Sequence, residues 1–266
     1  MDLILAAASC DPATDIICVP ESVNELFELP FVGIFNRTML LMLLAAAIVA
    51  AILYFGLRRR AVVPTKFGAG VESLVTYVRD EIAIGIIGPQ DGLKYFPYLL
   101  SLFLFLLVGN LFEIAPLVNF PITSRIALPA FLAIVTWVIF VAAGFRKQGL
   151  GYVGHLLWPP GVPTALKPLV GIIEFVSTFL VRPFSLAVRL FANLVAGHVM
   201  LTLLLVSGWV FLSNVGDIGL RAAIGIGWFA LGLAIFVFEM VVAILQAYIF
   251  TLLSAVYIQT SVHPEH

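Results

Sequence analysis

Apolar runs long enough to cross a lipid bilayer constrain this chain more than any other feature of its sequence. A transmembrane helix takes about 20 predominantly apolar residues, and residues 38–57, 98–118 and 126–145 each form such a run. The sequence is 62% hydrophobic and only 11% charged, whereas soluble domains are about a quarter charged. We therefore predict an all-α, polytopic integral membrane protein with about five transmembrane helices.

Two further apolar runs, at 168–212 and 221–258, are too long for ordinary upright helices. Each would measure on the order of 55–65 Å as a continuous helix at 1.5 Å per residue, while the hydrocarbon core is about 30 Å thick. Ordinary tilt absorbs only part of such an excess. We expect two long, strongly tilted helices, with a break in each run as the alternative.

The remaining segments give the expected domain organisation. Residues 1–36 form an extracytoplasmic N-terminal tail in this interpretation, and residues 37–266 form a single membrane domain. Within that domain, residues 71–87 alternate apolar with charged side chains, which is typical of an amphipathic helix at the membrane surface. Residues 149–163 are rich in Gly and Pro and predict a loop.

Basic residues predict the orientation, because Lys and Arg accumulate in cytoplasmic loops. With five spans and the N-terminus outside, the outer side holds only Arg37, Arg125 and Arg221. The C-terminus is then cytoplasmic. The character of the N-terminal tail favours a bacterial plasma membrane, with the mitochondrial inner membrane as the alternative. The inner loops and the surface helix hold the larger set of basic residues, namely Arg58, Arg59, Arg60, Lys66, Arg79, Lys94, Arg146, Lys147 and Lys167.

Composition also argues against several other functions. The net charge is −1, so there is no electrostatic case for a nucleic-acid partner. The two cysteines, Cys10 and Cys18, lie in the tail and outside any CxxC or Cys/His cluster, so we expect no structural metal and no cofactor. They are compatible with a disulfide or with two free thiols. The sequence contains no GxxxxGK[ST] phosphate-binding pattern.

Arg189 is the candidate functional residue that stands out most. It lies in RPFSLAVRLFANLVAGH, residues 182–198, with apolar runs on both sides and no acid within one helical turn. A mid-membrane arginine costs roughly 2.5–3.5 kcal/mol on insertion scales. Helical spacing places Ser185 and Asn193 on its face, beside small residues that allow another helix to approach. We expect its counter-charge on another helix or subunit; an arginine satisfied by carbonyls of its own bundle is the alternative.

The last two apolar runs carry further polar residues. Glu239 and Gln246 are seven residues apart and so share a helix face. His198 lies on the other long run. A glutamate and a histidine on facing helices would form a protonatable pair, which suits a proton path. A hydrogen-bonded histidine near an interface is the alternative.

Three more candidates lie within predicted spans. Asn110 and Glu113 interrupt the second span. A polar site inside the membrane and an acid at a loop edge are equally good interpretations of Glu113, because Pro116 follows closely. Glu174 lies on the inner side of the fourth span, where a channel acid and a snorkelling surface acid both fit.

These residues occur in segments that resemble subunit a of F-type ATP synthases. The most specific segments are RPFSLAVRLFANLVAGH (182–198) and LQAYIFTLLSAVY (245–257). The resemblance extends through VPTKFGAGVESLV (63–75), GNLFEIAP (109–116) and FPITSRIALP (120–129). It covers most of the chain after about residue 30 and implies the stationary proton-channel subunit of the Fo sector, with two offset half-channels.

The resemblance also implies roles for single residues. Arg189 would be the essential arginine that faces the carboxylates of the rotor ring, with Asn193 and Gln246 as polar neighbours. His198 and Glu239 would form a channel pair, in the order opposite to that of many bacterial members of the family.

The half-channels and partners follow in the same way. Asn110 and Glu113 would belong to the outer half-channel. Glu174 resembles the acid of the inner one, one residue further from Arg189 than in some members. The implied partners are the c-ring proteolipids, the subunit b peripheral stalk, the rest of the F1Fo complex and membrane lipid. The chain would not be an enzyme by itself, because nucleotide chemistry would take place on partner subunits.

Two other functions compete with this interpretation. A secondary transporter would use Arg189 to bind an anionic substrate, but the sequence shows no internal repeat of the kind from which many such folds are built. A non-catalytic membrane scaffold would not need so many polar groups inside its spans.

Overall fold

The computed structural model describes residues 37–57, 65–114, 126–149, 151–158, 166–213 and 220–263. Every regular element in these ranges is a helix, and five helical segments are long and apolar enough to cross a membrane. The prediction of an all-α, polytopic membrane protein is therefore confirmed. The expected tail at residues 1–36, with Cys10 and Cys18, lies outside the described residues.

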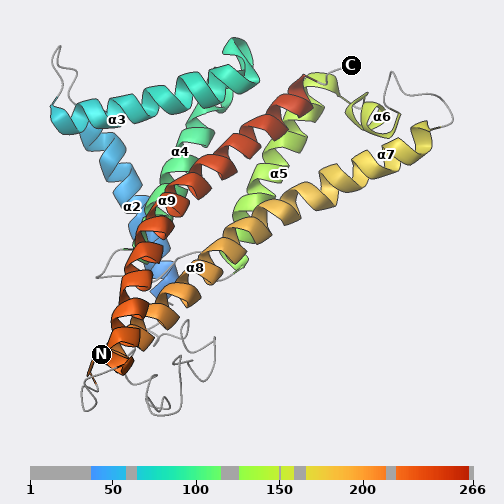
Figure 1. Ribbon diagram of the computed structural model, residues 1–266. Coiled ribbons are helices and arrows are strands. Elements are labelled where there is room, and N and C mark those ends of the chain that lie inside the picture. Colours follow the sequence, from blue (N-terminus) through green and yellow to red (C-terminus); the bar gives the residue numbers. More distant parts are fainter. Residues whose placement is uncertain are drawn as a thin grey trace. The chain divides into compact units, whose positions relative to one another are not determined.

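Figure 1 traces the helices along the chain from blue to red. The elements are α2 (Arg37–Leu57), α3 (Lys66–Tyr77), η1 (Val78–Ile87), α4 (Pro89–Ile114), α5 (Ala127–Gln148), α6 (Gly151–Leu157), α7 (Lys167–Val176), η2 (Ser177–Val181), α8 (Arg182–Ser213) and α9 (Leu220–Val262).

The chain forms two compact units. Unit 1 comprises Met1–Leu43, Gly109–Ser124 and Ala192–Leu245. Helices α2, α4, α8 and α9 each contribute residues to both units. Unit 2 comprises Leu44–Val108, Arg125–Phe191 and Gln246–His266.

The two long apolar runs are continuous helices. Helix α9 extends for 43 residues without interruption, which corresponds to about 64 Å at 1.5 Å per residue. Helices α7, η2 and α8 likewise follow one another without a break, although the middle segment is π-helical. There the Arg182 N–H donates to the Ser177 carbonyl, five residues back instead of four.

The segment between the first two spans is helical over more of its length than the sequence suggested. The amphipathic helix expected at 71–87 begins at Lys66, where the Thr65 hydroxyl accepts a hydrogen bond from the Gly68 N–H at 3.2 Å. Gly88 ends η1 with a φ of 102°, a conformation that favours glycine. Helix α4 then starts at Pro89, nine residues before the span expected at 98–118.

The expected loop at 149–163 contains the short helix α6, which lies against α7 in unit 2 (Figure 1). A methyl group on Gly171 of α7 would collide with the Leu157 carbonyl of α6. On its other side α6 contacts α5, because a methyl group on Gly144 would lie 2.6 Å from the Tyr152 ring. Small residues at both contacts allow these helices to pack closely, and a Gly/Pro-rich composition alone does not reveal this.

Polar contacts hold three helix ends together in unit 2. Lys147 Nζ at the end of α5 donates to Asp91 Oδ2 at 2.7 Å, and His263 Nε2 lies 3.4 Å from the same oxygen. The Gln148 side chain donates to the Ser261 carbonyl at 2.8 Å. These contacts fix the last turn of α9 against the beginning of α4 and the end of α5.

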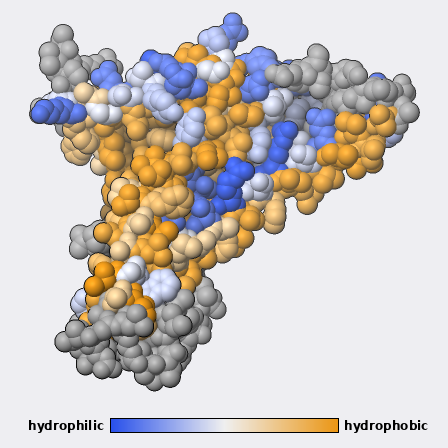
Figure 2. All heavy atoms as spheres, in the orientation of Figure 1, coloured by the Kyte–Doolittle hydropathy of each residue, from blue (hydrophilic) through white to orange (hydrophobic). Residues whose placement is uncertain are grey.

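The surface matches a lipid environment. Figure 2 shows hydrophobic residues along the long helices, with hydrophilic residues along α3 and η1 and in a diagonal band through the middle of this face. Only about a tenth of the most apolar window of α2 is buried. Exposed apolar side chains of this extent mark a membrane or protein contact surface.

The closest approach between η1 and α4 generates a stability prediction. A methyl group on Gly92 would collide with the Ala83 carbonyl, whereas one on Gly70, an exposed interior position of α3, would touch nothing within 4 Å. We expect Gly92→Ala to destabilise the protein by about 1–3 kcal/mol through overpacking. Gly70→Ala should be neutral or stabilise it by up to about 1 kcal/mol through helix propensity.

Thermal unfolding of the two purified variants in the same detergent measures both effects. Equal midpoints for the two substitutions would show that the contact at Gly92 does not restrict the packing of η1 against α4.

Candidate functional site

Arg189 lies on an outward face of α8 in unit 2. Its neighbours Leu186, Ala187 and Leu190 are buried, with exposed fractions of 1%, 6% and 0%, whereas Arg189 itself is exposed. Within the described part of the chain, no carboxylate lies within ion-pair distance of its guanidinium. The helix therefore packs into the unit with its apolar side and presents a permanent positive charge outward.

Arg182, the other arginine of α8, contrasts with Arg189. Its guanidinium stacks over the Tyr257 ring, 5.1 Å from the centroid, and its Nη1 donates to Thr260 Oγ1 at 3.4 Å. A cation over an aromatic ring is stabilised by the negative face of that ring. The two arginines lie two turns apart on one helix but have different surroundings. Arg182 contacts α9, whereas Arg189 has no anionic partner in the described residues.

The other candidates in unit 2 are less exposed than Arg189. Ser185 and Glu174 are half-buried, and Gln246 on α9 is 6% exposed. The Gln246 Nε2 is buried without a hydrogen-bond partner among the described residues. An unsatisfied buried amide is costly, so this donor is available to a water molecule or to a partner subunit.

The π-helical segment η2 lies between Glu174 and Arg189. A π-helical turn contains one residue more than an α-helical turn, and such bulges are frequent at functional sites. The π-helical turn therefore shifts the helical phase between Glu174 and Arg189 from that obtained by counting at 100° per residue.

In unit 1, α8 and α9 approach each other at Gly197. A methyl group on Gly197 would lie 2.5 Å from the carboxyl carbon of Glu239, so only glycine leaves room for that side chain. Glu239 is 8% exposed, and His198, the residue after Gly197 on α8, is 3% exposed. Both ionisable residues are therefore buried within unit 1.

Asn110 joins α4 to this contact. It is fully buried, and its Nδ2 donates to the Ala243 carbonyl at 3.2 Å. Ala243 lies one turn after Glu239 on α9. The Asn110 Oδ1 accepts no hydrogen bond from the described residues, so one acceptor in this apolar surrounding is left for water or a proton donor.

In unit 1, Asn110, His198 and Glu239 are each buried, while Asn193 is half-buried on α8. Glu113 lies in the last turn of α4, and its side chain is outside the described residues. Among the described residues, no group of three or more His, Cys, Asp or Glu side chains is arranged to hold a metal ion.

Sequence reasoning missed two partners of these candidates. The contact of Gly197 with Glu239 joins residues 42 positions apart, and the only hint was the small side chain of Gly197. The stacking of Arg182 on Tyr257 was not predicted either.

Known proteins resemble this chain over most of its length. The family model of the ATP synthase A chain matches residues 39–259. A protein named ATP synthase subunit a from Frankia alni is 40% identical over 255 residues, covering 91% of this chain and 86% of the relative. The protein of that name from Gluconobacter oxydans is 40% identical over 86% of this chain and 88% of its own length. The one from Streptomyces lividans is 37% identical over 87% and 81%.

Proposed function

The chain belongs to the ATP synthase A chain family, and from this premise we propose that it is the stationary proton-channel subunit of the Fo sector of a rotary ATP synthase. Its work in that complex is to carry protons, and nucleotide chemistry takes place on partner subunits. The partners are the c-ring of proteolipids and the subunit b peripheral stalk. The N-terminus lies outside and the C-terminus in the cytoplasm of a bacterial plasma membrane.

The exposed, unpaired charge of Arg189 carries this proposal. It lies near the midpoint of the continuous helical stretch Lys167–Leu212, where an uncompensated charge is most expensive. A rotor carboxylate that approaches in the membrane plane supplies the missing counter-charge. Because the rotor turns, successive carboxylates pair with the same arginine one at a time.

Two offset half-channels connect the rotor to the two sides of the membrane. Asn110, His198, Glu239 and Glu113 line the outer one, and the burial of the first three within unit 1 supports this assignment. Glu174 and Ser185 belong to the inner one. A single continuous water path would dissipate the gradient, so each half-channel extends only to mid-membrane.

The catalytic cycle follows from the cost of charge in lipid. A proton that enters through the outer half-channel neutralises a rotor carboxylate, and the neutral site can then turn through lipid without a buried charge. After nearly a full turn it meets Arg189. A nearby positive charge favours the ionised carboxylate, so the proton leaves through the inner half-channel.

Asn193 and Gln246 assist Arg189 as polar neighbours in this cycle. The unpartnered Nε2 of Gln246 supports such a role, because it is a donor that a passing carboxylate or a water molecule can use. Each charge that crosses the membrane is driven by about 2.3 kcal/mol per 100 mV. Several crossings are combined mechanically for each ATP.

Arg189→Ala tests the central claim. We expect the variant to insert and assemble but to lose proton-driven ATP synthesis, because no fixed charge remains to release the rotor proton. Inverted membrane vesicles with an imposed proton gradient provide the measurement. Arg79→Ala is the control, since that arginine is exposed on η1 and pairs with its neighbour Asp80 at 2.7 Å. Wild-type synthesis rates in Arg189→Ala would contradict the mechanism.

His198→Ala and Glu239→Gln test the outer half-channel. If the two residues act as one proton-uptake unit, the double variant should lose no more activity than the more severe single variant. The initial rate of proton uptake into vesicles measures the step. Losses that are strictly additive in free energy would show that the residues act independently.

Gly197→Ala tests the position of the Glu239 carboxyl group. The added methyl group must displace that side chain, so we expect proton uptake to fall about 10-fold or more, in the range set by misplaced catalytic groups. Gly227→Ala on α9 is the matched control, because a methyl group there touches nothing within 4 Å. Unchanged uptake in Gly197→Ala would mean that the contact has no part in proton transfer.

A further inference from the structure

The π-helical turn η2 leaves one backbone carbonyl without a donor from its own helix. The Arg182 N–H donates to the Ser177 carbonyl, five residues back, so it does not serve the Thr178 carbonyl, its usual acceptor in an α-helix. In π geometry the Thr178 carbonyl would accept from residue 183. That residue is Pro183, which has no N–H. The Thr178 carbonyl therefore needs a donor that the helix does not provide.

Pro183 also accounts for the π turn itself. In a regular α-helix the proline ring would collide with the carbonyl four residues back, here that of Phe179. A wider turn just before the proline relieves this collision, and π adjustments of this kind accompany prolines in transmembrane helices. The unpaired Thr178 carbonyl is thus a consequence of the local sequence.

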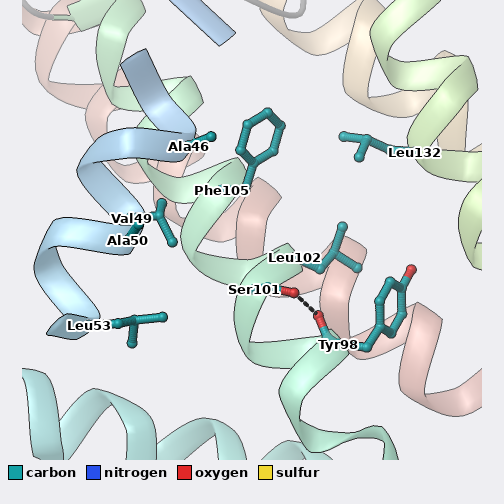
Figure 3. Close-up of a pocket in the computed structure, with 9 residues that line it drawn as sticks. All are labelled: Ala46, Val49, Ala50, Leu53, Tyr98, Ser101, Leu102, Phe105 and Leu132. Atoms are coloured by element: carbon teal, nitrogen blue, oxygen red, sulfur yellow. Dashed lines mark hydrogen bonds between the residues drawn. The ribbon is translucent and has the colours of Figure 1, made fainter. Parts of the chain in front are cut away.

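The side chain of Thr178 is unpaired as well. Thr178 is 1% exposed, and its Oγ1 is buried without a hydrogen-bond partner among the described residues. Other helical hydroxyls of this chain donate to a backbone carbonyl three or four residues earlier. They are Ser101 to Tyr98, drawn in Figure 3, Thr136 to Leu132, Thr202 to His198, Thr251 to Ala247 and Ser254 to Phe250, at 2.7–2.9 Å. Thr178 departs from this pattern at the π turn.

Helix α5 packs against this turn. The Trp137 ring of α5 meets the Phe179 ring edge to face, with the ring centroids 5.7 Å apart. The Trp137 Nε1 is itself buried without a hydrogen-bond partner among the described residues, so it does not donate to Thr178. An unsatisfied carbonyl is costly in hydrocarbon. The missing donor must therefore be small enough to fit between packed helices.

We propose that η2 binds one buried water molecule, which donates to the Thr178 carbonyl and accepts a hydrogen bond from the Thr178 hydroxyl. Both oxygen atoms belong to one residue, so covalent geometry keeps them within reach of the same water. A buried water needs two to four polar partners, and ordered waters are among the groups that satisfy freed backbone carbonyls in transmembrane helices.

The bound water has a consequence for the geometry of the helix. It offsets the cost of the π turn and so maintains the helical phase between Glu174 and Arg189. The meaning of that phase for the inner half-channel rests on the proposed function, whereas the water site itself does not.

Cryo-electron microscopy of the assembled complex in nanodiscs, at a resolution that shows ordered water, tests the site directly. We expect density about 2.7–3.2 Å from both Thr178 Oγ1 and the Thr178 carbonyl oxygen. The absence of this density would overturn the proposal. So would a Thr178 hydroxyl that donates to the Glu174 carbonyl, or a Trp137 indole that donates to Thr178.

A double-mutant cycle tests the same site through thermal unfolding of the purified chain. Thr178→Val removes one partner of the water at nearly constant volume, so we expect the midpoint to fall by about 2–10 °C. Pro183→Ala restores an N–H that can reach the Thr178 carbonyl. In that background Thr178→Val should lower the midpoint about half as much or less.

Thr251→Val is the matched control. That hydroxyl is fully buried and donates to the Ala247 carbonyl at 2.9 Å within an α-helix, so its removal should cost less and equally in both backgrounds. Equal costs of Thr178→Val with and without Pro183→Ala would show that the Thr178 hydroxyl and carbonyl share no water. Neither measurement requires proton transport, so failure of this site and failure of the proposed function, tested at Arg189, are separate outcomes.

Discussion

A backbone amide or carbonyl that finds no partner in hydrocarbon costs several kcal/mol, and the architecture of this chain depends on that constraint. Every described segment that is apolar enough to cross a membrane is helical. Even where the helix departs from α geometry, at η1 and η2, it becomes π-helical and keeps most of its hydrogen bonds. Backbone polar groups inside the membrane are therefore largely engaged in helical hydrogen bonds. Any polar chemistry there depends on a few side chains.

Close glycine contacts contribute to the helix packing that positions these side chains, because apolar surface gives little drive for helix association in lipid. Gly92 and Gly171 bring backbone against backbone in unit 2, and Gly197 makes room for the Glu239 carboxyl group in unit 1. Close contacts at glycine thus contribute both to helix packing and to the geometry of the candidate site. Glycine at position 197 leaves room for the buried Glu239 carboxyl group without a break in either helix.

The helices were predictable because length and apolarity alone select a transmembrane helix. The beginning of α4 was not, since residues 89–97 contain charges and two prolines, and only the turn at Gly88 reveals where the new helix starts. The lack of an acidic partner for Arg189 on its own helix was also predictable, because the residues that surround it on that helix are its neighbours in sequence. Arg182 on Tyr257 and Asn110 on Ala243 join residues 75 and 133 positions apart, and no periodicity reveals such pairs.

Two basic side chains, Arg189 and Lys94, differ because of where they lie along their helices, and of the two only Lys94 lies near a described carboxylate, that of Asp91. Lys94 is in the second turn of α4, where a flexible lysine reaches water or a lipid phosphate. Arg189 is near the middle of a 46-residue apolar stretch, more than 30 Å of helix from either end at 1.5 Å per residue, and cannot reach either boundary. Its charge is permanent, so deprotonation does not relieve the cost. In the mechanism that we propose, a mobile carboxylate on a neighbouring subunit is the partner that resolves this, and it comes and goes as the arginine releases one proton after another.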